Sequence, residues 1–300
     1  MKQSVLGRQV AYPEHYSPEI LVRVDRAENR SAHAIDIARL PFVGFDVWNA
    51  YEVSILTENG VPVNFVLRML YPCESPYIVE SKSLKLYLNA FNKSRFGRSV
   101  DEVVSFLTAT VSHDLSSLLE IPVKVVLETP PTAAGHTVLS PGMACEPPVE
   151  WPCWGMADLS SAPLTAYKED RSLLRGDSGK GGILMGMTDM LRSRCKVTSQ
   201  PDWGDLYLYM QGERLPSVDK LLRYIVSFRD ENHFHEEVVE MIYAALWSLF
   251  TPEELLVMAF YTRRGGIDIN PVRASRTELI TRFAPHVSGF GHISVKSPRQ

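Results

Sequence analysis

The thiol of Cys195 and the carboxylate of Asp202 are the two side chains of this sequence best suited to covalent chemistry. They lie in the stretch Ser193–Gly204, which reads S-R-C-K-V-T-S-Q-P-D-W-G. We predict a strand over residues 195–199 that breaks at Pro201 and then restarts, so that the turn sets Asp202 near the thiol. A thiol attacks as its thiolate, and a neighbouring proton acceptor favours that form. The stretch therefore predicts an activated nucleophile; the alternative is a small buried cysteine beside an ordinary Pro-Asp turn.

Arg194 and Lys196 flank the thiol and could be taken for its activators. On a strand, however, neighbouring side chains point to opposite faces. We therefore expect help for Cys195 to come through the turn, from Asp202, or from another segment.

Histidines and acids gather in E-N-H-F-H-E-E at Glu231–Glu237, at the start of a predicted helix over residues 235–250. Glu236, in the first turn of that helix, would be ionised with its oxygens available to a ligand. Phe234 offers a flat apolar face. A purine-like base needs such a carboxylate to accept its N–H groups and an aromatic ring on which to stack. The alternative is a set of ordinary first-turn acids and surface histidines.

A zinc site made of Cys195, His233 and His235 is chemically admissible. No second cysteine with ligand spacing accompanies these three residues. We therefore predict no metal in this protein.

Two further segments are suited to phosphate groups. In Glu80–Lys85, E-S-K-S-L-K, hydroxyl groups and free N–H groups at a helix start lie beside lysines, with Lys93, Arg95 and Arg98 downstream. We predict Ser81 or Ser83 as the cap of this helix. In Arg263–Arg273, two arginines precede a Gly-Gly turn and could clamp a diphosphate, although a charged strand end gives the same string.

The glycine-rich stretch Gly176–Gly182, G-D-S-G-K-G-G, imitates two known motifs without matching either. It lacks the spacing and the terminal Ser/Thr of a P-loop, and the G-D-S-G of serine proteases belongs to an all-β chain with a different residue order. We predict a flexible loop.

Composition sets the class of protein. With 300 residues and 45% hydrophobic content, the chain can form one large or two ordinary domains. A net charge of −4, from 31 basic and 35 acidic residues, gives no general attraction to nucleic acid or membrane. Four cysteines are too few for a disulfide framework, and the N-terminus lacks the apolar core of a signal peptide. We expect a cytoplasmic protein with no membrane association.

The first half, residues 1–130, reads as an antiparallel sheet with paired helices. Strands are predicted at residues 19–24, 47–56, 61–69, 78–80 and 122–127, with a hairpin turn at Asn59-Gly60. Ser99 should cap a long helix whose apolar stripe is Val100, Val103, Val104, Leu107, Val111, Leu115 and Leu118.

Residues 131–165 form a proline-rich connection, in which Trp151 and Trp154 suggest packing. The second half, residues 166–300, repeats the plan: hairpin strands at residues 195–199 and 206–211, helices at 217–229 and 235–250, and a strand at 255–262. L-K-L-Y-L-N-A-F at residues 84–91 is faintly matched by L-L-R-Y-I-V-S-F at residues 221–228. Helices that follow paired strands predict an α+β class with two related halves.

Taken together, four of these motifs resemble the 7-cyano-7-deazaguanine reductases, the NADPH-dependent nitrile reductases of queuosine biosynthesis, in their long two-half form. The motifs are E-S-K-S-L-K-L-Y-L-N from Glu80, R-S-x-C-x-V-T-x-Q-P-D-W-G from Arg192, F-H-E from Phe234 and R-R-G-G-I-D-I-N-P from Arg263. Their number and order make the resemblance specific over most of the chain. The stretch Gly176–Gly182 departs from the family's pattern.

The resemblance implies a role for each residue that matches a family motif. Cys195 would add to the nitrile carbon and form a thioimidate, Asp202 would donate a proton to nitrogen, and His235 would assist. Phe234 and Glu236 would hold the deazaguanine, with Glu80 on the same base. The residues expected near NADPH are Ser81, Lys82, Ser83, Lys85, Arg263 and Arg264.

The resemblance also implies a fold: tandem tunnelling-fold (T-fold) halves that close into a barrel on assembly, in a homodimer or a larger homo-oligomer. The ligands would be 7-cyano-7-deazaguanine and two NADPH, without direct contact to nucleic acid. Two other functions fit the residues. One is a thiol hydrolase or cyclohydrolase-like enzyme using Cys195 and water; the other is a purine- or pterin-binding protein in which Cys195 is inert.

Overall fold

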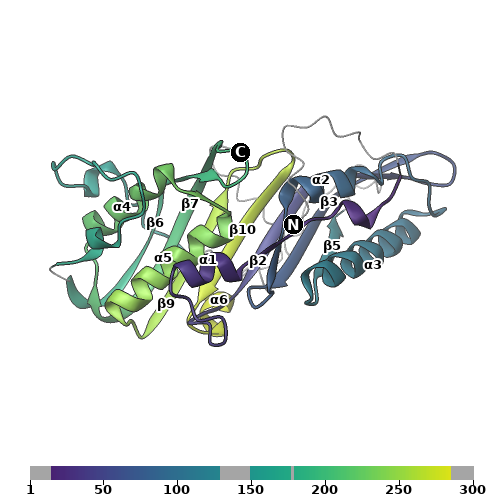
Figure 1. The fold of residues 1–300 in the computed structure, drawn as a ribbon. Helices are drawn as coiled ribbons and strands as arrows, with labels where there is room; N and C mark the ends of the chain where they lie inside the picture. The colour runs from purple at the N-terminus through teal and green to yellow at the C-terminus, as the bar shows by residue number, and fades with distance from the viewer. Residues whose placement is uncertain (1–14, 129–148, 177–178, 285–300) are drawn as a thin grey trace. The chain divides into compact units, whose positions relative to one another are not determined.

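The computed structural model describes residues 15–128, 149–176 and 179–284 (Figure 1). By their internal contacts these divide into two units, each drawn from several chain segments. Unit 1 comprises Met1–Arg26, Val47–Glu146 and Arg263–Asp268, and unit 2 comprises Ala27–Asp46, Pro147–Thr262 and Ile269–Gln300. The N-terminal segment Ala27–Asp46, which we placed with the first half, therefore clusters with the residues of the second.

Strands of unit 1 follow one another in the order β5-β3-β2. The bounds are β2 (Val43–Leu56, of which Val47 onward belongs to this unit), β3 (Pro62–Pro72) and β5 (Lys124–Glu128), with β1 (Arg23–Asp25) pairing β4 (Tyr77–Val79). The β2–β3 connection is the predicted Asn59-Gly60 turn, in which Gly60 has φ of 82° and the Thr57 N–H donates to the Val61 carbonyl at 2.9 Å.

Two helices of unit 1 are α2 (Ser81–Asn89) and α3 (Val100–Leu119), and α3 runs alongside β5 (Figure 1). The Ser99 side chain accepts the Glu102 N–H, as predicted for its cap. Buried residues of α3 repeat with helical spacing at Val103, Leu107, Val111, Leu115 and Leu119. The cap of α2 is instead Glu80, whose carboxylate accepts the Ser83 N–H, so the prediction of a serine cap was wrong.

Unit 2 contains strands in the order β10-β9-β7-β6-β8. Their bounds are β6 (Gly179–Cys195), β7 (Pro201–Leu215), β8 (Asn232–His233), β9 (Glu254–Tyr261) and β10 (Ile267–Ala274, of which Ile269 onward belongs to this unit). The β6–β8 pair is parallel, whereas β6–β7, β7–β9 and β9–β10 are antiparallel. Mainly antiparallel strands with helices confirm the mixed α and β class.

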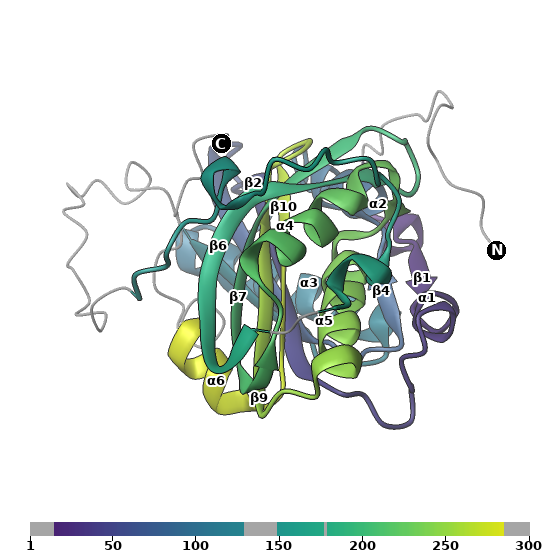
Figure 2. The same ribbon diagram turned by 90° about the vertical axis from the view of Figure 1, so that its left-hand side faces the viewer.

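The helices of unit 2 cover both faces of these strands. They are α1 (Ala27–Ala32), α4 (Val218–Ser227), α5 (His235–Phe250) and α6 (Thr277–Phe283). Short 3₁₀ turns lie at Met156–Asp158, Arg171–Leu174 and Phe228–Asp230 in the same unit, and one lies at Pro18–Ile20 in unit 1. Figure 2 shows α4 and α5 on one side of the strands and α6 on the other. On the α6 side, the rings of Tyr209 and Phe283 lie 4.5 Å apart.

The hairpin that carries the thiol differs from the prediction. Cys195 ends β6 instead of beginning a strand, residues 196–200 form the turn, and Pro201 opens β7. Proline is tolerated there because the first residue of a strand need not donate to the ladder. The strand predicted over residues 19–24 is confirmed only at its end, since residues 18–20 form a 3₁₀ turn and β1 begins at Arg23.

The glycine-rich stretch is largely strand, which corrects the loop prediction. β6 begins at Gly179, and Gly182 pairs with Gly212 of β7. A Cβ on Gly181 would lie 2.9 Å from the Glu213 backbone, so a glycine here permits close approach of the two strands. Asp177 and Ser178 lie outside the described residues, as do residues 131–148 of the predicted connection.

Trp151 and Trp154 pack as expected. Trp154 is 8% exposed and covers Gly186, where a Cβ would lie 2.3 Å from the indole ring. Trp151 contacts Tyr207 and Phe283. No helix of the described residues is both long and apolar enough to span a membrane.

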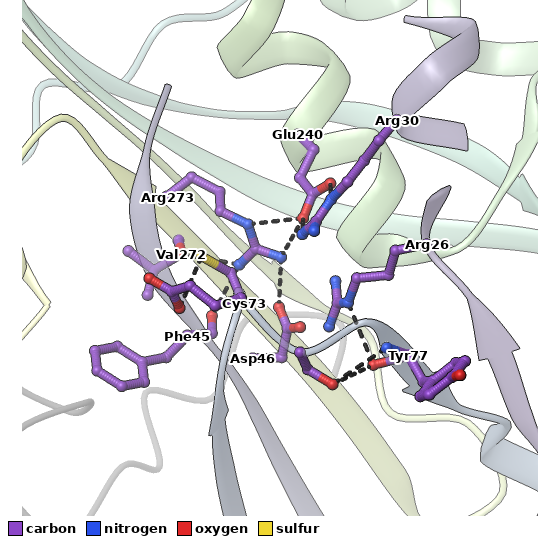
Figure 3. Close-up of polar contacts among 11 residues, drawn as sticks. Arg26, Arg30, Phe45, Asp46, Cys73, Tyr77, Glu240, Val272 and Arg273 are labelled. Carbon is purple, nitrogen blue, oxygen red and sulfur yellow. Dashed lines mark hydrogen bonds and ion pairs between the residues drawn. The ribbon is translucent and has the colours of Figure 1, made fainter. Parts of the chain in front are cut away.

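A charged network lies in the core of unit 2 (Figure 3). The guanidinium of Arg273 contacts Asp46 at 2.8 Å and Glu240 at 2.9 Å, and Arg30 binds both oxygens of Glu240 at 2.8 and 2.9 Å. These four side chains are 0–2% exposed. Two arginines and two carboxylates thus neutralise each other, tying α1, the start of β2, α5 and β10 together.

Candidate functional site

Cys195 is held at the mouth of the β6–β7 turn and is half-buried. Its N–H donates to the Gln200 carbonyl and its carbonyl accepts the Ser199 N–H, both at 2.8 Å. Ser199 takes the left-handed conformation, with φ of 56°, that closes the turn. The backbone on both sides of the thiol is therefore fixed.

Asp202 shares a face of the sheet with Cys195. Ser193 lies directly opposite Asp202 in the antiparallel register, and Cys195 is two residues beyond Ser193. Paired residues point to the same face, as do residues two apart on one strand, so the thiol and the carboxylate are diagonal neighbours. Asp202 is 3% exposed.

His235, the first residue of α5, lies over this face. Its Nε2 is 3.4 Å from Oδ2 of Asp202. Its ring stacks on that of Tyr261, with centroids 3.8 Å apart and planes 6° from parallel. Tyr261 stands opposite Gly204 in the β7–β9 register, so the imidazole is aligned by an aromatic side chain that the sequence analysis missed.

Negative charge is concentrated beside Tyr261. Burial raises the pKa of Tyr261 well above its usual value, and the nearby charges of Asp202 and Glu236 raise it further. The phenol therefore stays neutral. Glu236 is 1% exposed, in the first turn of α5, where the positive end of the helix dipole favours a carboxylate.

Glu237 fixes the start of α5. Its Oε2 accepts the Phe234 N–H at 3.0 Å, and its Oε1 accepts from Nζ of Lys196 at 2.9 Å. Burial tends to raise the pKa of Glu237, but hydrogen bonds from His233, Lys196 and Phe234 outweigh it and hold the pKa below its usual value. Lys196 also lies 5.5 Å from the centre of the Phe234 ring.

The two cations that flank the thiol are engaged elsewhere. Arg194 contacts Asp230 at 2.6 Å, while Lys196 binds Glu237. For Arg194, on β6, this agrees with the strand alternation that predicted it to point away from Cys195, whereas Lys196 lies in the turn, where the alternation does not apply.

His233 lies in register with Cys195 in the parallel β6–β8 pair. Its Nδ1 is 3.2 Å from Glu237, and its Nε2 is 3.2 Å from Glu231. The ring of His33 meets it edge-on at 5.7 Å.

Among the described residues, no cluster of three His, Cys, Asp or Glu side chains could hold a metal ion. The alternative zinc site at Cys195 therefore has no support from the geometry.

Glu80 and the residues after it belong to unit 1. Glu80 is 5% exposed and caps α2 through its Oε2, 2.6 Å from the Ser83 nitrogen. The Ser83 hydroxyl donates to the Glu80 carbonyl and accepts the Val22 N–H. Ser83 is fully buried, whereas Ser81 and Lys82 are partly exposed.

Lys85 meets the Gly-Gly turn of the fourth motif in a shallow depression of unit 1. The depression is lined by Ala50, Glu52, Lys85, Leu88, Asn89, Gly265, Gly266 and Ile267. Both glycines have positive φ, 58° and 81°, and a Cβ on Gly266 would lie 2.6 Å from the Glu52 carboxyl carbon. Lys85 pairs with Glu52 at 3.1 Å, and Arg263 lies 4.4 Å from the Tyr51 ring.

The structure therefore brings the predicted residues together in two groups. In unit 2, Cys195, Asp202, His235, Phe234 and Glu236 gather around the β6–β7 turn and the start of α5. In unit 1, Lys85 joins the turn that follows Arg263 and Arg264. Sequence reasoning missed Tyr261 and the contacts of His233 with Glu231 and Glu237. The alternation of β9 could have indicated Tyr261 only once its pairing with β7 was known.

Comparison with known proteins gives consistent results along the chain. Residues 12–127 match the family model described as nitrile reductase, 7-cyano-7-deazaguanine-reductase N-term, and residues 201–279 match that of QueF-like protein. The NADPH-dependent 7-cyano-7-deazaguanine reductase of Dechloromonas aromatica is 39% identical over 272 residues, covering 91% of this chain and 90% of that protein.

Two further relatives carry the same name. That of Azoarcus sp. is 40% identical over 285 residues (91% of this chain, 90% of the relative), and that of Psychrobacter cryohalolentis is 39% identical over 283 residues (92% and 95%). The resemblance inferred from the four motifs is confirmed.

Proposed function

Since the chain belongs to the NADPH-dependent 7-cyano-7-deazaguanine reductase family, we propose that it reduces the nitrile of 7-cyano-7-deazaguanine to the primary amine in queuosine biosynthesis. The observation that carries the proposal is the placement of Cys195, Asp202 and His235 on one face of the unit 2 strands. A thiol, a carboxylate and an imidazole are the groups needed to add to a C≡N bond and protonate its nitrogen.

The thiolate of Cys195 adds to the nitrile carbon, and the nitrogen takes a proton. The product is a covalent thioimidate. When protonated it is a cationic C=N group, which accepts hydride far more readily than a nitrile does, so covalent catalysis divides one difficult step into easier ones.

Asp202 and His235 supply the proton. The carboxylate is 3% exposed and lies 3.4 Å from the imidazole, which is close enough for a proton to pass between the two groups. Tyr261 keeps the imidazole plane fixed by stacking. A group that is aligned before the reaction needs no reorganisation during it.

The substrate base is held by Glu236 and Phe234. A deazaguanine presents N–H groups on one edge and a flat face, which match a carboxylate and an aromatic ring. Glu80 is proposed to accept from the same substrate, in addition to its role as the cap of α2.

The cofactor is proposed to bind in unit 1 at Lys82, Lys85, Arg263 and Arg264, with Ser81 at the start of α2. Cationic side chains and a glycine turn that exposes its backbone suit a diphosphate. Ser83 is assigned to the helix start, because its hydroxyl makes two internal hydrogen bonds. NADPH supplies hydride; two NADPH and two protons convert one nitrile to one amine.

Three wider expectations belong to the proposal. Each half would be a T-fold unit, barrels would close in a homodimer or a larger homo-oligomer, and the protein would act in the cytoplasm without direct contact to nucleic acid. The mixed sheet-and-helix units support the first of these.

The test combines the absorbance of NADPH, which measures cofactor consumption, with mass spectrometry of the peptide that contains Cys195. Protein mixed with 7-cyano-7-deazaguanine alone should gain one substrate mass on the peptide that contains Cys195, and addition of NADPH should consume two cofactors per nitrile. A hydrolase would turn over without NADPH, and a binding protein would form no adduct. Absence of both the adduct and cofactor consumption would overturn the proposed function.

A contrast of two variants separates the substrate from the cofactor. Glu80→Ala should weaken nitrile binding and slow adduct formation without NADPH, whereas Lys85→Ala should leave adduct formation normal and raise the KM for NADPH. Adduct formation by Glu80→Ala at the wild-type rate and affinity would remove Glu80 from the substrate site.

A further inference from the structure

We propose that His233 is a positioning residue, which as an imidazolium holds the end of β6, with Cys195, against the first turn of α5, with His235 and Glu236. The proposal rests on the proposed function for its effect on catalysis. Its physical basis is a pair of contacts that the reaction itself does not use.

Both ring nitrogens of His233 face carboxylates. Nδ1 lies 3.2 Å from Oε2 of Glu237, and Nε2 lies 3.2 Å from Oε2 of Glu231. The His233 side chain is 15% exposed. The imidazole thus spans from the residues just before β8 to the first turn of α5.

The two contacts require a particular protonation state. An ionised carboxylate only accepts hydrogen bonds, and a neutral imidazole has a single N–H, so its second nitrogen would set a lone pair against an anionic oxygen. Only the imidazolium donates to Glu231 and Glu237 together. Loss of one proton therefore breaks one side of the bridge.

Each residue that contributes a carboxylate to His233 also binds a neighbour of the thiol, Glu231 through its backbone carbonyl and Glu237 through its carboxylate. The Arg194 N–H donates to the Glu231 carbonyl at 2.7 Å, and Nζ of Lys196 donates to Glu237 at 2.9 Å. Glu237 additionally accepts the Phe234 N–H. The bridge therefore fixes the residues on both sides of Cys195 and the residue that precedes His235.

Other titratable and charged groups face this bridge. His33 meets the ring at 5.7 Å, and Arg171 lies 3.4 Å from Nδ1 of His33 and 3.1 Å from Glu169. Burial, and then the charges of His233 and Arg171, lower the pKa of His33. A lowered pKa at His33 disfavours a second positive charge beside His233.

The experiment measures the rate of adduct formation on Cys195 from about pH 6 to about pH 9, with excess nitrile and no NADPH. His233→Gln should lower nitrile affinity and the adduct rate about tenfold at the wild-type optimum and leave the KM for NADPH unchanged. His233→Arg keeps a permanent charge and N–H groups that can donate to both carboxylates, so it should restore part of the rate at the alkaline end.

Glu231→Gln is the more specific variant. It removes one anionic acceptor while Glu237 still caps α5, so the imidazolium loses its proton at lower pH and the alkaline limb of the rate profile should move toward acid. His113→Gln, an exposed histidine of α3 in unit 1, is the matched control and should leave the profile unchanged. If His233→Gln does not fold, the shift in Glu231→Gln decides the question.

A wild-type rate and pH profile in His233→Gln, or an unshifted limb in Glu231→Gln, overturns the proposal. Failure of the proposed function looks different, because the wild-type protein would then form no adduct. In that case, the hydrogen-exchange rates of the backbone amides at residues 233–238 report whether the bridge between His233, Glu231 and Glu237 forms in the absence of substrate. Faster exchange in His233→Gln than in His113→Gln supports the bridge, and equal exchange overturns it.

Discussion

Helix α5 carries buried carboxylates in two contrasting settings one turn apart. Glu240, in the middle of the helix, meets Arg30 and Arg273, with all three side chains 0–2% exposed. Glu237, in the first turn, meets His233 and the partly exposed Lys196. Guanidinium groups keep their charge at any physiological pH, whereas an imidazole titrates near neutrality.

The contrast separates structure from chemistry on a single helix. At Glu240 the partners are buried guanidinium groups of fixed charge. At Glu237, close to the half-buried thiol, the partners are groups that can change charge. We therefore expect substitutions in the arginine network to act on stability and those around the thiol to act on activity.

The largest effect is expected at the thiol. Cys195→Ala should abolish adduct formation and NADPH consumption, because no other described group near Asp202 is a thiol, while the unfolding midpoint stays close to that of the wild type. Cys153→Ala, which alters an exposed thiol, is the control and should retain full activity. Residual adduct in Cys195→Ala would place the nucleophile elsewhere.

Glu240→Gln should produce the largest loss of stability. It leaves two buried guanidinium groups with too little negative charge, and removal of one partner from a buried pair costs about 3–5 kcal/mol. Urea unfolding measures the difference, with the exposed Glu213→Gln as control. A loss below about 1 kcal/mol would contradict a structural role for the network.

Glu236→Gln should show the opposite behaviour. Loss of a charged acceptor should weaken nitrile binding by about tenfold to a hundredfold, equivalent to about 1.5–3 kcal/mol, without lowering the free energy of unfolding. Titration of the nitrile against the variant, beside the exposed first-turn control Glu278→Gln, gives the comparison. If the free energy of unfolding falls and the affinity for the nitrile does not, Glu236 stabilises the fold, as Glu240 does, and does not bind the substrate.

The smallest effect is a pH dependence at Glu237. Its pKa is lowered in the folded state because the donated hydrogen bonds outweigh burial, so it adds stability above its unfolded pKa of about 4.3 and loses it as the pH falls through the lower folded value. The stability difference between wild type and Glu237→Gln should be largest near neutral pH and shrink below about pH 4. A constant difference would assign the stabilisation to packing.

Much of the fold follows from local sequence patterns. The helix at residues 235–250, the cap at Ser99 and the turn at Gly60 were predicted because each depends on a few neighbouring residues. The bounds of β6 and β7 were not predicted correctly. Strands of this length are stabilised by pairing with each other and not by the propensity of their own residues.

The candidate site shows the same limit. Its residues could be chosen from their chemistry and from family motifs, but the register that sets Ser193 opposite Asp202 and Gly204 opposite Tyr261 depends on pairing between strands. The arginine network joins Arg30 and Asp46 to residues about two hundred positions away, and nothing in the local sequence announces it.

The interleaved membership of the two units has a consequence for synthesis on the ribosome. Ala27–Asp46 is made early but belongs with unit 2, and Arg263–Asp268 is made late but belongs with unit 1. Neither unit is complete until the chain has passed residue 268, and Asp46 must wait for Arg273 to be translated before its buried partner exists. A nascent chain of this protein therefore cannot finish its N-terminal part first, and premature termination near the C-terminus should leave both units unfinished.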